Sequence, residues 1–121
     1  YYQMARRALR EADYQNCMTY CQEALRLDPQ SAYYALLADV QVRNPDQRWQ
    51  RRAEENYQKA VDLDPWNPDH LVSLARLYRL QGLKSRARKM LEKALEITPN
   101  HKEAQAELSE IDRAGTPEVP V

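Results

Sequence analysis

The sequence is poor in the residues that phosphate-binding loops, metal sites and many β-rich folds use. It contains no phenylalanine, two glycines, two cysteines and two histidines among 121 residues. Two glycines cannot build a glycine-rich phosphate loop, and the histidines lack the spacing of a zinc site on one helix. The chain is instead rich in Ala, Leu, Arg, Glu and Gln, which lose little side-chain freedom in a helix. The composition therefore predicts an all-α protein with no metal and no cofactor.

Net charge and long apolar runs are also missing. The 18 Lys and Arg residues offset 18 Asp and Glu residues, so the formal net charge is zero. No overall field would draw the chain to nucleic acid or to an anionic membrane. No apolar run approaches the roughly 18 residues of a membrane span, and residues 1–10 lack the layout of a signal peptide. We therefore expect no membrane insertion and no nucleic-acid partner, and a cytoplasmic location.

A repeat of about 34 residues organises the chain. Three segments end alike, as EALRLDP, KAVDLDP and KALEITP, and their prolines are Pro29, Pro65 and Pro99. In each segment an alanine stands five residues before the proline, at Ala24, Ala60 and Ala94. An aliphatic residue stands two before it, at Leu27, Leu63 and Ile97. Self-similarity at this period indicates stacked helical units.

The repeats resemble the tetratricopeptide repeat, in which an aromatic, Leu, Gly and Tyr on a first helix precede Ala, an aromatic and Pro on a second. The third segment matches best, with Leu71, Leu74, Ala75, Tyr78, Ala87, Leu91, Ala94 and Pro99. The first has Tyr1, Met4, Ala5, Ala8, Cys17, Cys21, Ala24 and Pro29. The second has Tyr34, Leu37, Ala38, Ala53, Tyr57, Ala60 and Pro65, with an enlarged turn between residues 41 and 53.

The resemblance implies an all-α, right-handed solenoid of antiparallel helix pairs. We expect about seven helices, at residues 1–11, 14–27, 31–43, 48–63, 68–81, 84–97 and 101–113. The domain would span 1–113, with repeats at 1–31, 32–67 and 68–100, a capping helix at 101–113 and a flexible tail or linker at 114–121. Asn100 with Glu103 approximates a capping box at the start of the last helix.

The same resemblance implies where a ligand would bind. In this family the first helices of successive repeats form a concave wall with recurring ligand contacts. By position these contacts are Tyr2, Arg6, Leu9, Arg10, Asp39, Arg43, Val72, Arg76 and Arg79. Arginine grips carboxylates through a planar fork, so five arginines on this wall favour an acidic peptide or partner segment. Alternatively, Glu103, Glu107 and Glu110 of the last helix pair with these arginines and leave the wall satisfied.

One sub-type of the family does not fit. Adaptors that clamp the C-terminal carboxylates of heat-shock chaperones use Lys and Asn, one turn apart, on their first helix. The corresponding residues here are Tyr2 and Arg6, and the later clamp positions hold Leu36, Asp69 and Ser73. The resemblance therefore implies a repeat domain that is not of the carboxylate-clamp type.

The enlarged turn contains a second candidate surface, because arginines surround Trp49 there. Trp and Arg dominate binding hot spots, so Trp49 is a possible interface anchor. The structural reading is favoured: Trp49 folds back on its own repeat, and the arginines pair with Asp46, Glu54 and Glu55. Trp66 is expected to pack in the turn between repeats.

The remaining reactive side chains are assigned to structure. Cys17 and Cys21 are four residues apart and could form half of a thiolate site, but no further cysteine exists. Both fall at core positions, which favours free, buried thiols. His70 and His101 are interpreted as solvated residues near helix starts, so no catalytic site is expected.

These observations predict a protein-interaction module and not an enzyme. The module would belong to a larger, bacterial-type protein and bind a protein or peptide, with no small-molecule substrate. The alternative is a structural spacer or a self-association element. A local charge pattern, and not the net charge, would select the partner.

Overall fold

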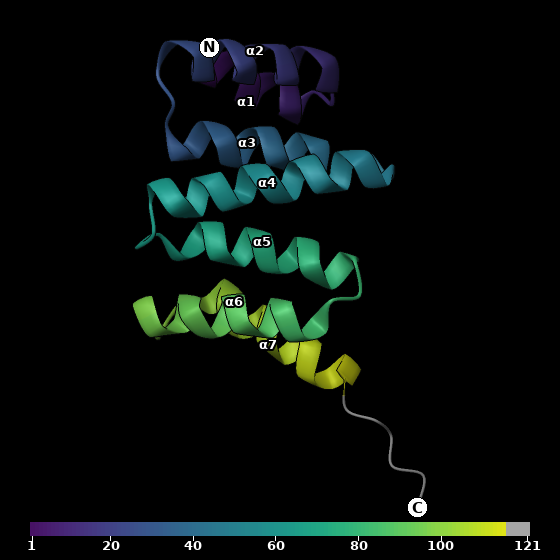
Figure 1. Cartoon of the computed structure of the whole chain (residues 1–121), viewed down its shortest axis with the longest axis vertical. Helices are drawn as coiled ribbons and strands as arrows, with labels where there is room; N and C mark the ends of the chain where they lie inside the picture. Colours follow the sequence, from purple (N-terminus) through teal and green to yellow (C-terminus); the bar gives the residue numbers. More distant parts are fainter. Residues whose placement is uncertain (116–121) are drawn as a thin grey trace, which may run out of the picture. The chain divides into compact units, whose positions relative to one another are not determined.

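A computed structural model describes residues 1–115, which form seven α-helices and no strand (Figure 1). The helices are α1 (Tyr2–Arg10), α2 (Tyr14–Leu27), α3 (Ser31–Gln41), α4 (Gln47–Leu63), α5 (Pro68–Leu80), α6 (Lys84–Ile97) and α7 (Lys102–Gly115). The predicted ranges of α2 and α6 are reproduced, and the others differ by one or two residues at an end. The all-α prediction is confirmed.

The chain forms two compact units with the border at Pro65. Unit 1 contains α1 to α4, in which each helix packs on the next and α1 also contacts α3. Unit 2 contains α5 to α7, which all contact one another. The border lies close to the predicted end of the second repeat at residue 67. The predicted tail begins within α7, which continues to Gly115, and residues 116–121 lie outside the described part.

Small side chains lie where the two helices of a pair approach each other. Each first helix has an alanine, and each second helix an alanine or cysteine, that is at most 1% exposed at the family's small position: Ala5, Ala38 and Ala75, then Cys17, Ala53 and Ala87. Such residues let helix backbones come close without leaving a void. In unit 2, Leu74, Leu77 and Leu91 fill the remaining interior and are fully buried.

The second repeat buries polar groups between α3 and α4, and each has a partner. The Asn56 side-chain amide donates a hydrogen bond to Gln41 Oε1 at 2.8 Å. The Tyr57 hydroxyl donates to Asp39 Oδ1 at 2.5 Å. Because a buried polar group without a partner is costly, these contacts fix how α3 and α4 pair.

The tight turns inside the first and third repeats use a left-handed backbone at equivalent positions. Gly82 has a φ of 78° and Ala12 has a φ of 58°. A Cβ atom on Gly82 would meet no atom within 4 Å, so only the backbone conformation disfavours a side chain there. An L-residue in this region costs about 1–2 kcal/mol, and Ala12 therefore carries a local strain that Gly82 avoids.

Exchanging the residues at these two turns should change stability in opposite directions. We expect Gly82→Ala to lower the free energy of unfolding by roughly 0.5–1 kcal/mol, because the smaller unfolded-state entropy of alanine offsets part of the strain. Ala12→Gly should raise it by roughly 0.5–1 kcal/mol, after the entropy cost of glycine is subtracted. Urea denaturation followed by circular dichroism measures both. Changes of the same sign at both turns would contradict the strain argument.

The two thiols of α2 belong to the core of unit 1. Cys17 is 0% exposed and Cys21 is 1% exposed, and both are free. Burial raises the pKa of Cys17, although the hydrogen bond with Cys21 opposes it. Burial, followed by the charge of Cys17, raises the pKa of Cys21 to about 12. Both groups are therefore neutral thiols in the folded chain, as the core reading predicted.

The thiols should react with Ellman's reagent only after unfolding. At pH 8 a thiol with a pKa of about 12, as burial gives Cys21, is ionised to about one part in 10⁴, against about one part in four for a solvated thiol. We expect the folded chain to react at least about 100-fold more slowly than the chain in denaturant. An exposed thiol introduced by Ala106→Cys is the control and should react at once. Rapid reaction of the unmodified, folded chain would refute the assignment.

Candidate functional site

Helix α7 contacts the arginines of α5 that the resemblance assigns to ligand binding. Arg76 Nε lies 3.0 Å from Glu107 Oε1, and Arg79 Nε lies 3.1 Å from Glu107 Oε2. Arg76 Nη2 lies 3.2 Å from Glu103 Oε2. The Glu107 side chain is 16% exposed, so one half-buried carboxylate receives both guanidinium groups. These four residues, the α5–α7 ion cluster, neutralise the basic positions of the third repeat.

The ion cluster changes the ionisation of Arg76. Burial lowers the pKa of Arg76, but hydrogen bonds and charge from Glu107, together with Glu103, outweigh burial and raise the pKa above its ordinary value. Arg76 is therefore a cation in this cluster. In unit 2 the arginines therefore pair with Glu103 and Glu107 of the last helix, as the alternative expected, whereas Glu110 pairs with Arg113 of its own helix.

A second contact between α5 and α7 involves a histidine. His101 Nδ1 accepts the backbone N–H of Ala104 at 3.1 Å, so the ring proton of the neutral histidine is on Nε2. Nε2 lies 2.7 Å from Asp69 Oδ1 and donates to it. The interpretation of His101 as a solvated residue is wrong, because its side chain is 12% exposed. His101 takes the role at the start of α7 that the Asn100–Glu103 capping box was expected to have.

Val72 and Leu9 are less available than the resemblance implies. Val72 is 1% exposed and belongs to the core, so it offers no surface to a ligand. Leu9 is half-buried and packs against the core cluster of unit 1. Hydrophobic burial at these two positions supports the repeat itself.

The first helix of unit 1 presents arginines that have no acidic partner. The Arg6 guanidinium lies 5.8 Å from the centre of the Tyr2 ring, and Tyr2 packs on Tyr33 with ring centres 5.0 Å apart. Arg10 is exposed at the end of α1. Neither Arg6 nor Arg10 forms an ion pair with any residue between 1 and 115. Unit 1 therefore keeps available the positive charge that unit 2 neutralises.

Of the two predicted contact residues on α3, Asp39 takes part in helix packing and Arg43 is exposed. Asp39 is half-buried and accepts the Tyr57 hydrogen bond, so it takes part in the packing of α3 on α4. Arg43 is exposed and lies over the Tyr14 ring at 5.6 Å from its centre. Since α1 and α3 contact each other, Tyr2, Arg6, Arg10 and Arg43 belong to adjoining first helices. We call these four residues the arginine–tyrosine surface of unit 1.

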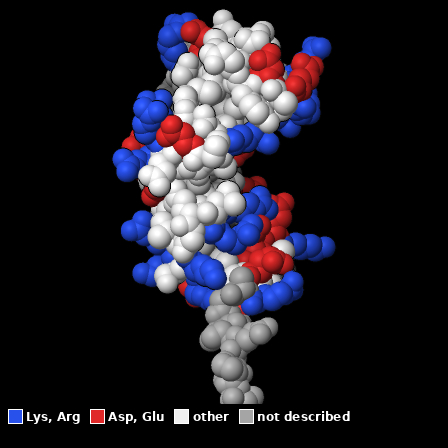
Figure 2. Space-filling model, turned by 90° about the vertical axis from the view of Figure 1, so that its right-hand side faces the viewer, with Lys and Arg blue, Asp and Glu red and all other residues white. Residues whose placement is uncertain are grey.

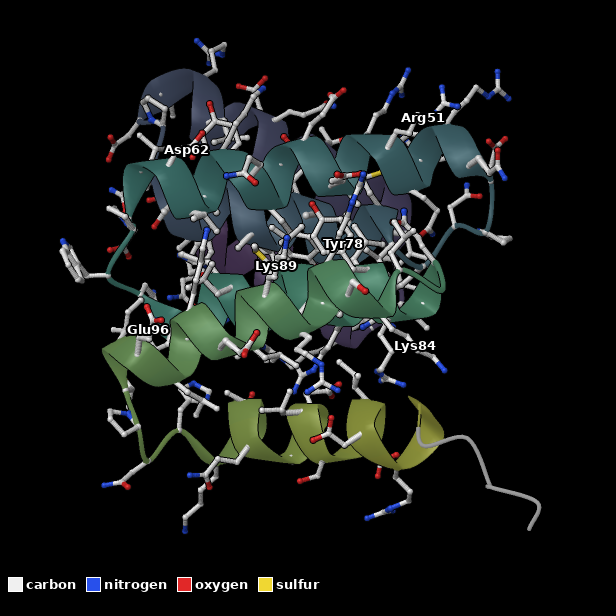
Figure 3. All side chains as sticks on the ribbon, turned by 60° about the horizontal axis from the view of Figure 1, so that its bottom comes forward. Arg51, Asp62, Tyr78, Lys84, Lys89 and Glu96 are labelled. Carbon is white, nitrogen blue, oxygen red and sulfur yellow. The ribbon has the colours of Figure 1, made fainter. Side chains whose placement is uncertain are left out.

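The enlarged turn places Trp49 beside an arginine of its own helix. Trp49 is half-buried, and the Arg52 guanidinium lies 4.9 Å from its ring centre. Arg48 Nη2 pairs with Asp46 Oδ2 at 3.1 Å, and Asp46 also caps the start of α4. Arg51 is exposed on the same helix (Figure 3). Arg48 and Arg52 thus have local contacts, with Asp46 and Trp49, and the role of Trp49 as an interface anchor stays a prediction.

The solvent exposure of His70 and of Trp66 differs from the prediction. His70 is 7% exposed and is buried in unit 2, where the Asn67 side-chain nitrogen lies 3.4 Å from its Nε2. It was interpreted as solvated, which is wrong, because the first turn of α5 is covered. Trp66 was expected to pack in the turn between repeats, but it is 79% exposed.

The structure also contains a shallow pocket that sequence reasoning missed. Its volume is about 200 Å³, and it lies between α1 and the first turns of α2. Its lining is Met4, Arg7, Ala8, Glu11, Asp13, Asn16 and Tyr20. Arg7 and Glu11 pair with each other at 3.1 Å, and Asp13 accepts hydrogen bonds from Asn16, so the charged groups of the pocket already have partners within it.

The described residues offer no cluster of three or more His, Cys, Asp or Glu that could hold a metal ion. Within the same residues no helix is long and apolar enough to cross a bilayer. Acidic and basic side chains are interspersed on the face shown in Figure 2, in keeping with the zero net charge. The chemistry on this surface is therefore that of local charge pairs and unpaired arginines.

Comparison with known proteins agrees with the repeat pattern. The chain is 31% identical over 106 residues to sperm-associated antigen 1 of Mus musculus, which covers 88% of this chain but 11% of that protein. The first TPR of Spaghetti (RPAP3), bound to the HSP90 peptide SRMEEVD, superposes with a TM-score of 0.82 at 20% identity, over 93% of this chain and 88% of that one. The Yersinia enterocolitica type III secretion chaperone SycD, in complex with a peptide of the translocator YopD, superposes with a TM-score of 0.81 at 17% sequence identity. That superposition covers 94% of this chain and 91% of the chaperone chain.

Two family models match, both described as tetratricopeptide repeat, over residues 1–31 and 51–111. The two matches cover the first repeat, the second helix of the second repeat, and the third repeat with most of α7, and they include all three prolines. Tetratricopeptide repeats are a protein-interaction fold, and their shared features here are the buried small residues of each helix pair. The chain belongs to the tetratricopeptide repeat family.

Proposed function

We propose that this chain binds an acidic segment of another protein and that the arginine–tyrosine surface of unit 1 makes the main contacts. The single observation that carries this proposal is the contrast between the units. Arg6 and Arg10 have no acidic partner among residues 1–115, whereas Arg76 and Arg79 are both paired with Glu107. An arginine that is not already paired can form a bidentate contact between its guanidinium group and a carboxylate of a ligand.

The tyrosines strengthen this surface. Tyr2 contacts both Arg6 and Tyr33, so its ring holds the guanidinium above a rigid aromatic base. Aromatic and arginine side chains are the residues that most often dominate binding energy at interfaces. The peptide SRMEEVD in the similar Spaghetti structure contains three carboxylate side chains, which supports an acidic ligand for this chain as well.

The proposed binding differs from that of the carboxylate-clamp adaptors. Tyr2 and Arg6 occupy the positions where those adaptors use Lys and Asn, and α5 carries Asp69 at a later clamp position. An Asp beside a ligand carboxylate would repel it. We therefore propose recognition of acidic side chains along a segment, with no dedicated clamp for a C-terminal carboxylate.

The proposed role is binding and not catalysis, and it fits a cytoplasmic location. Among the described residues, the His101 ring is committed to Ala104 and Asp69, and the two thiols are buried and neutral. Neither arrangement provides an activated nucleophile. Free thiols without disulfide bonds are typical of a reducing compartment.

A charge-reversal experiment tests the surface. Labelled peptides with several Glu or Asp residues are titrated at 150 mM salt, where the Debye length is about 8 Å and distant charges are screened. We expect Arg6→Glu with Arg10→Glu to weaken binding at least about tenfold, because charge-assisted hydrogen bonds contribute about 1.5–3 kcal/mol each. Fluorescence anisotropy gives the dissociation constants.

The matched control is Arg7→Glu with Arg26→Glu. These arginines are exposed and already paired with Glu11 and Glu23. The control makes the same change in net charge and should bind within about twofold of the unmodified chain. Equal losses in both double variants would show that net charge, and not this surface, attracts the peptide. Absence of any binding, with a mass that rises with concentration in light scattering, would favour self-association.

A further inference from the structure

Helix α7 is attached to α5 and α6 by a specific combination of charged and small apolar groups. Both carboxylate oxygens of Glu107 are used, one by each arginine of α5, and Glu103 adds a contact one turn earlier. On the adjoining face of α7, Ala104 is 0% exposed and Ile111 is 2% exposed. The four residues Glu103, Ala104, Glu107 and Ile111 that make these contacts recur at helical spacing, so a single face of α7 carries all of them.

The chemistry that α7 presents to α5 is the chemistry of an acidic ligand. Its carboxylates approach Arg76 and Arg79 through the Nε atoms, at 3.0 and 3.1 Å. The arginines remain 44% and 40% exposed, so the pairs lie at an edge that solvent and a competing helix can reach. Exposed ion pairs contribute little to stability, so this edge of the α7 contact is weak.

The rest of unit 2 is held together by a much larger apolar interior. Seven residues of α5 and three of α6 are buried, including Leu74 and Leu91 at 0% exposure. Helix α7 adds Ala104 and Ile111 to this core. Because α7 contributes fewer buried residues than α5, local opening at α7 requires less free energy than separation of α5 from α6.

We propose that α5 and α6 form an acceptor surface for an acidic amphipathic helix, that α7 is its resident occupant, and that an external helix of the same pattern displaces α7. The pattern is Glu-Ala-x-x-Glu-Leu-x-x-Ile, as at Glu103 to Ile111. The two glutamates bind Arg76 and Arg79, the alanine fits the fully buried position, and the isoleucine fills the end of the apolar face. The inference rests on the proposed function only in that the partner is a protein segment, and it concerns a different unit.

The loop before α7 supplies a fixed pivot for the exchange. His101 binds Asp69 on the first turn of α5 through Nε2, and its Nδ1 accepts the backbone N–H of Ala104. These contacts do not involve Arg76 or Arg79. Loss of the ion cluster would therefore release the middle of α7 first, while its N-terminal end remains next to α5.

The test uses the full chain and a labelled synthetic peptide of residues 100–113. Glu103→Arg with Glu107→Arg replaces the attraction to Arg76 and Arg79 by repulsion and should release α7. We expect this variant to bind the unmodified peptide at least about tenfold more tightly than the original chain does, because the resident helix no longer competes. Hydrogen exchange should show faster exchange of α7 amides, with α5 and α6 still protected.

A matched control makes the same charge change away from the acceptor surface. Glu96 is exposed on α6, and Glu110 pairs only with Arg113 of its own helix. Glu96→Arg with Glu110→Arg should keep α7 protected and should bind the peptide as weakly as the original chain. A combination of Glu103→Arg, Glu107→Arg, Arg76→Glu and Arg79→Glu restores opposite charges and should close the surface again.

Three outcomes would overturn the inference. The first is a release variant whose α7 amides stay as protected as before, and the second is exposure of α7 without a gain in peptide affinity. If the release variant does not fold, the original chain is titrated with excess peptide and the Nε–H signals of its arginines are followed by NMR. We expect the signals of Arg76 and Arg79 to shift with the unmodified peptide and not with the same peptide carrying both Glu→Arg changes; no shift is the third outcome.

The two proposals can fail independently. Loss of acidic-peptide binding in the Arg6 and Arg10 variant concerns unit 1 alone. Exchange of α7 concerns Arg76 and Arg79 of unit 2. A chain that exchanges α7 but binds no acidic peptide at α1 would refute the proposed function and leave the acceptor surface in place.

Discussion

The close approach of two helices within each repeat is the constraint on which the remaining structure depends. It requires a side chain no larger than alanine or cysteine at one position of each helix, and all six such positions are buried to within 1%. A larger side chain there would separate the helices and open voids beside them, which costs several kcal/mol in a packed interior. With the pairs fixed, Leu74, Leu77 and Leu91 can fill the space in unit 2, and the amide pair of Gln41 and Asn56 can form in unit 1.

The arginines on the first helices of the pairs are neutralised in unit 2 but not in unit 1. In unit 1, Arg6 rests over Tyr2 and Arg10 stays exposed, so positive charge is available to a partner. In unit 2, Glu107 receives Arg76 and Arg79 together, so the charge of both arginines is already neutralised within the unit. One repeat design therefore yields an open basic surface in one unit and a self-occupied one in the other.

The fold was largely predictable because its signals are local. The alanines before Pro29, Pro65 and Pro99 recur at one period, and packing neighbours in such repeats are close in sequence. The helix limits followed from turn residues such as Asn67 and Gly82, which act within one turn. The wrong predictions concern the burial of single side chains, which the repeat pattern does not encode. Whether His70 is covered or Trp66 is exposed depends on neighbours that a periodic pattern leaves unspecified.

The sequence by itself determined the repeat, the helix pairs and the arginines on the first helices, because each follows from residue type and spacing within about 34 residues. Only the tertiary structure decided which arginines are already paired. Arg76 meets Glu107 across 31 positions and Glu103 across 27, and such pairs depend on the angle at which α7 returns to α5. A charge-assisted hydrogen bond requires an N···O distance near about 3 Å, so a helix rotated by a fraction of a turn would have left these groups without direct contact.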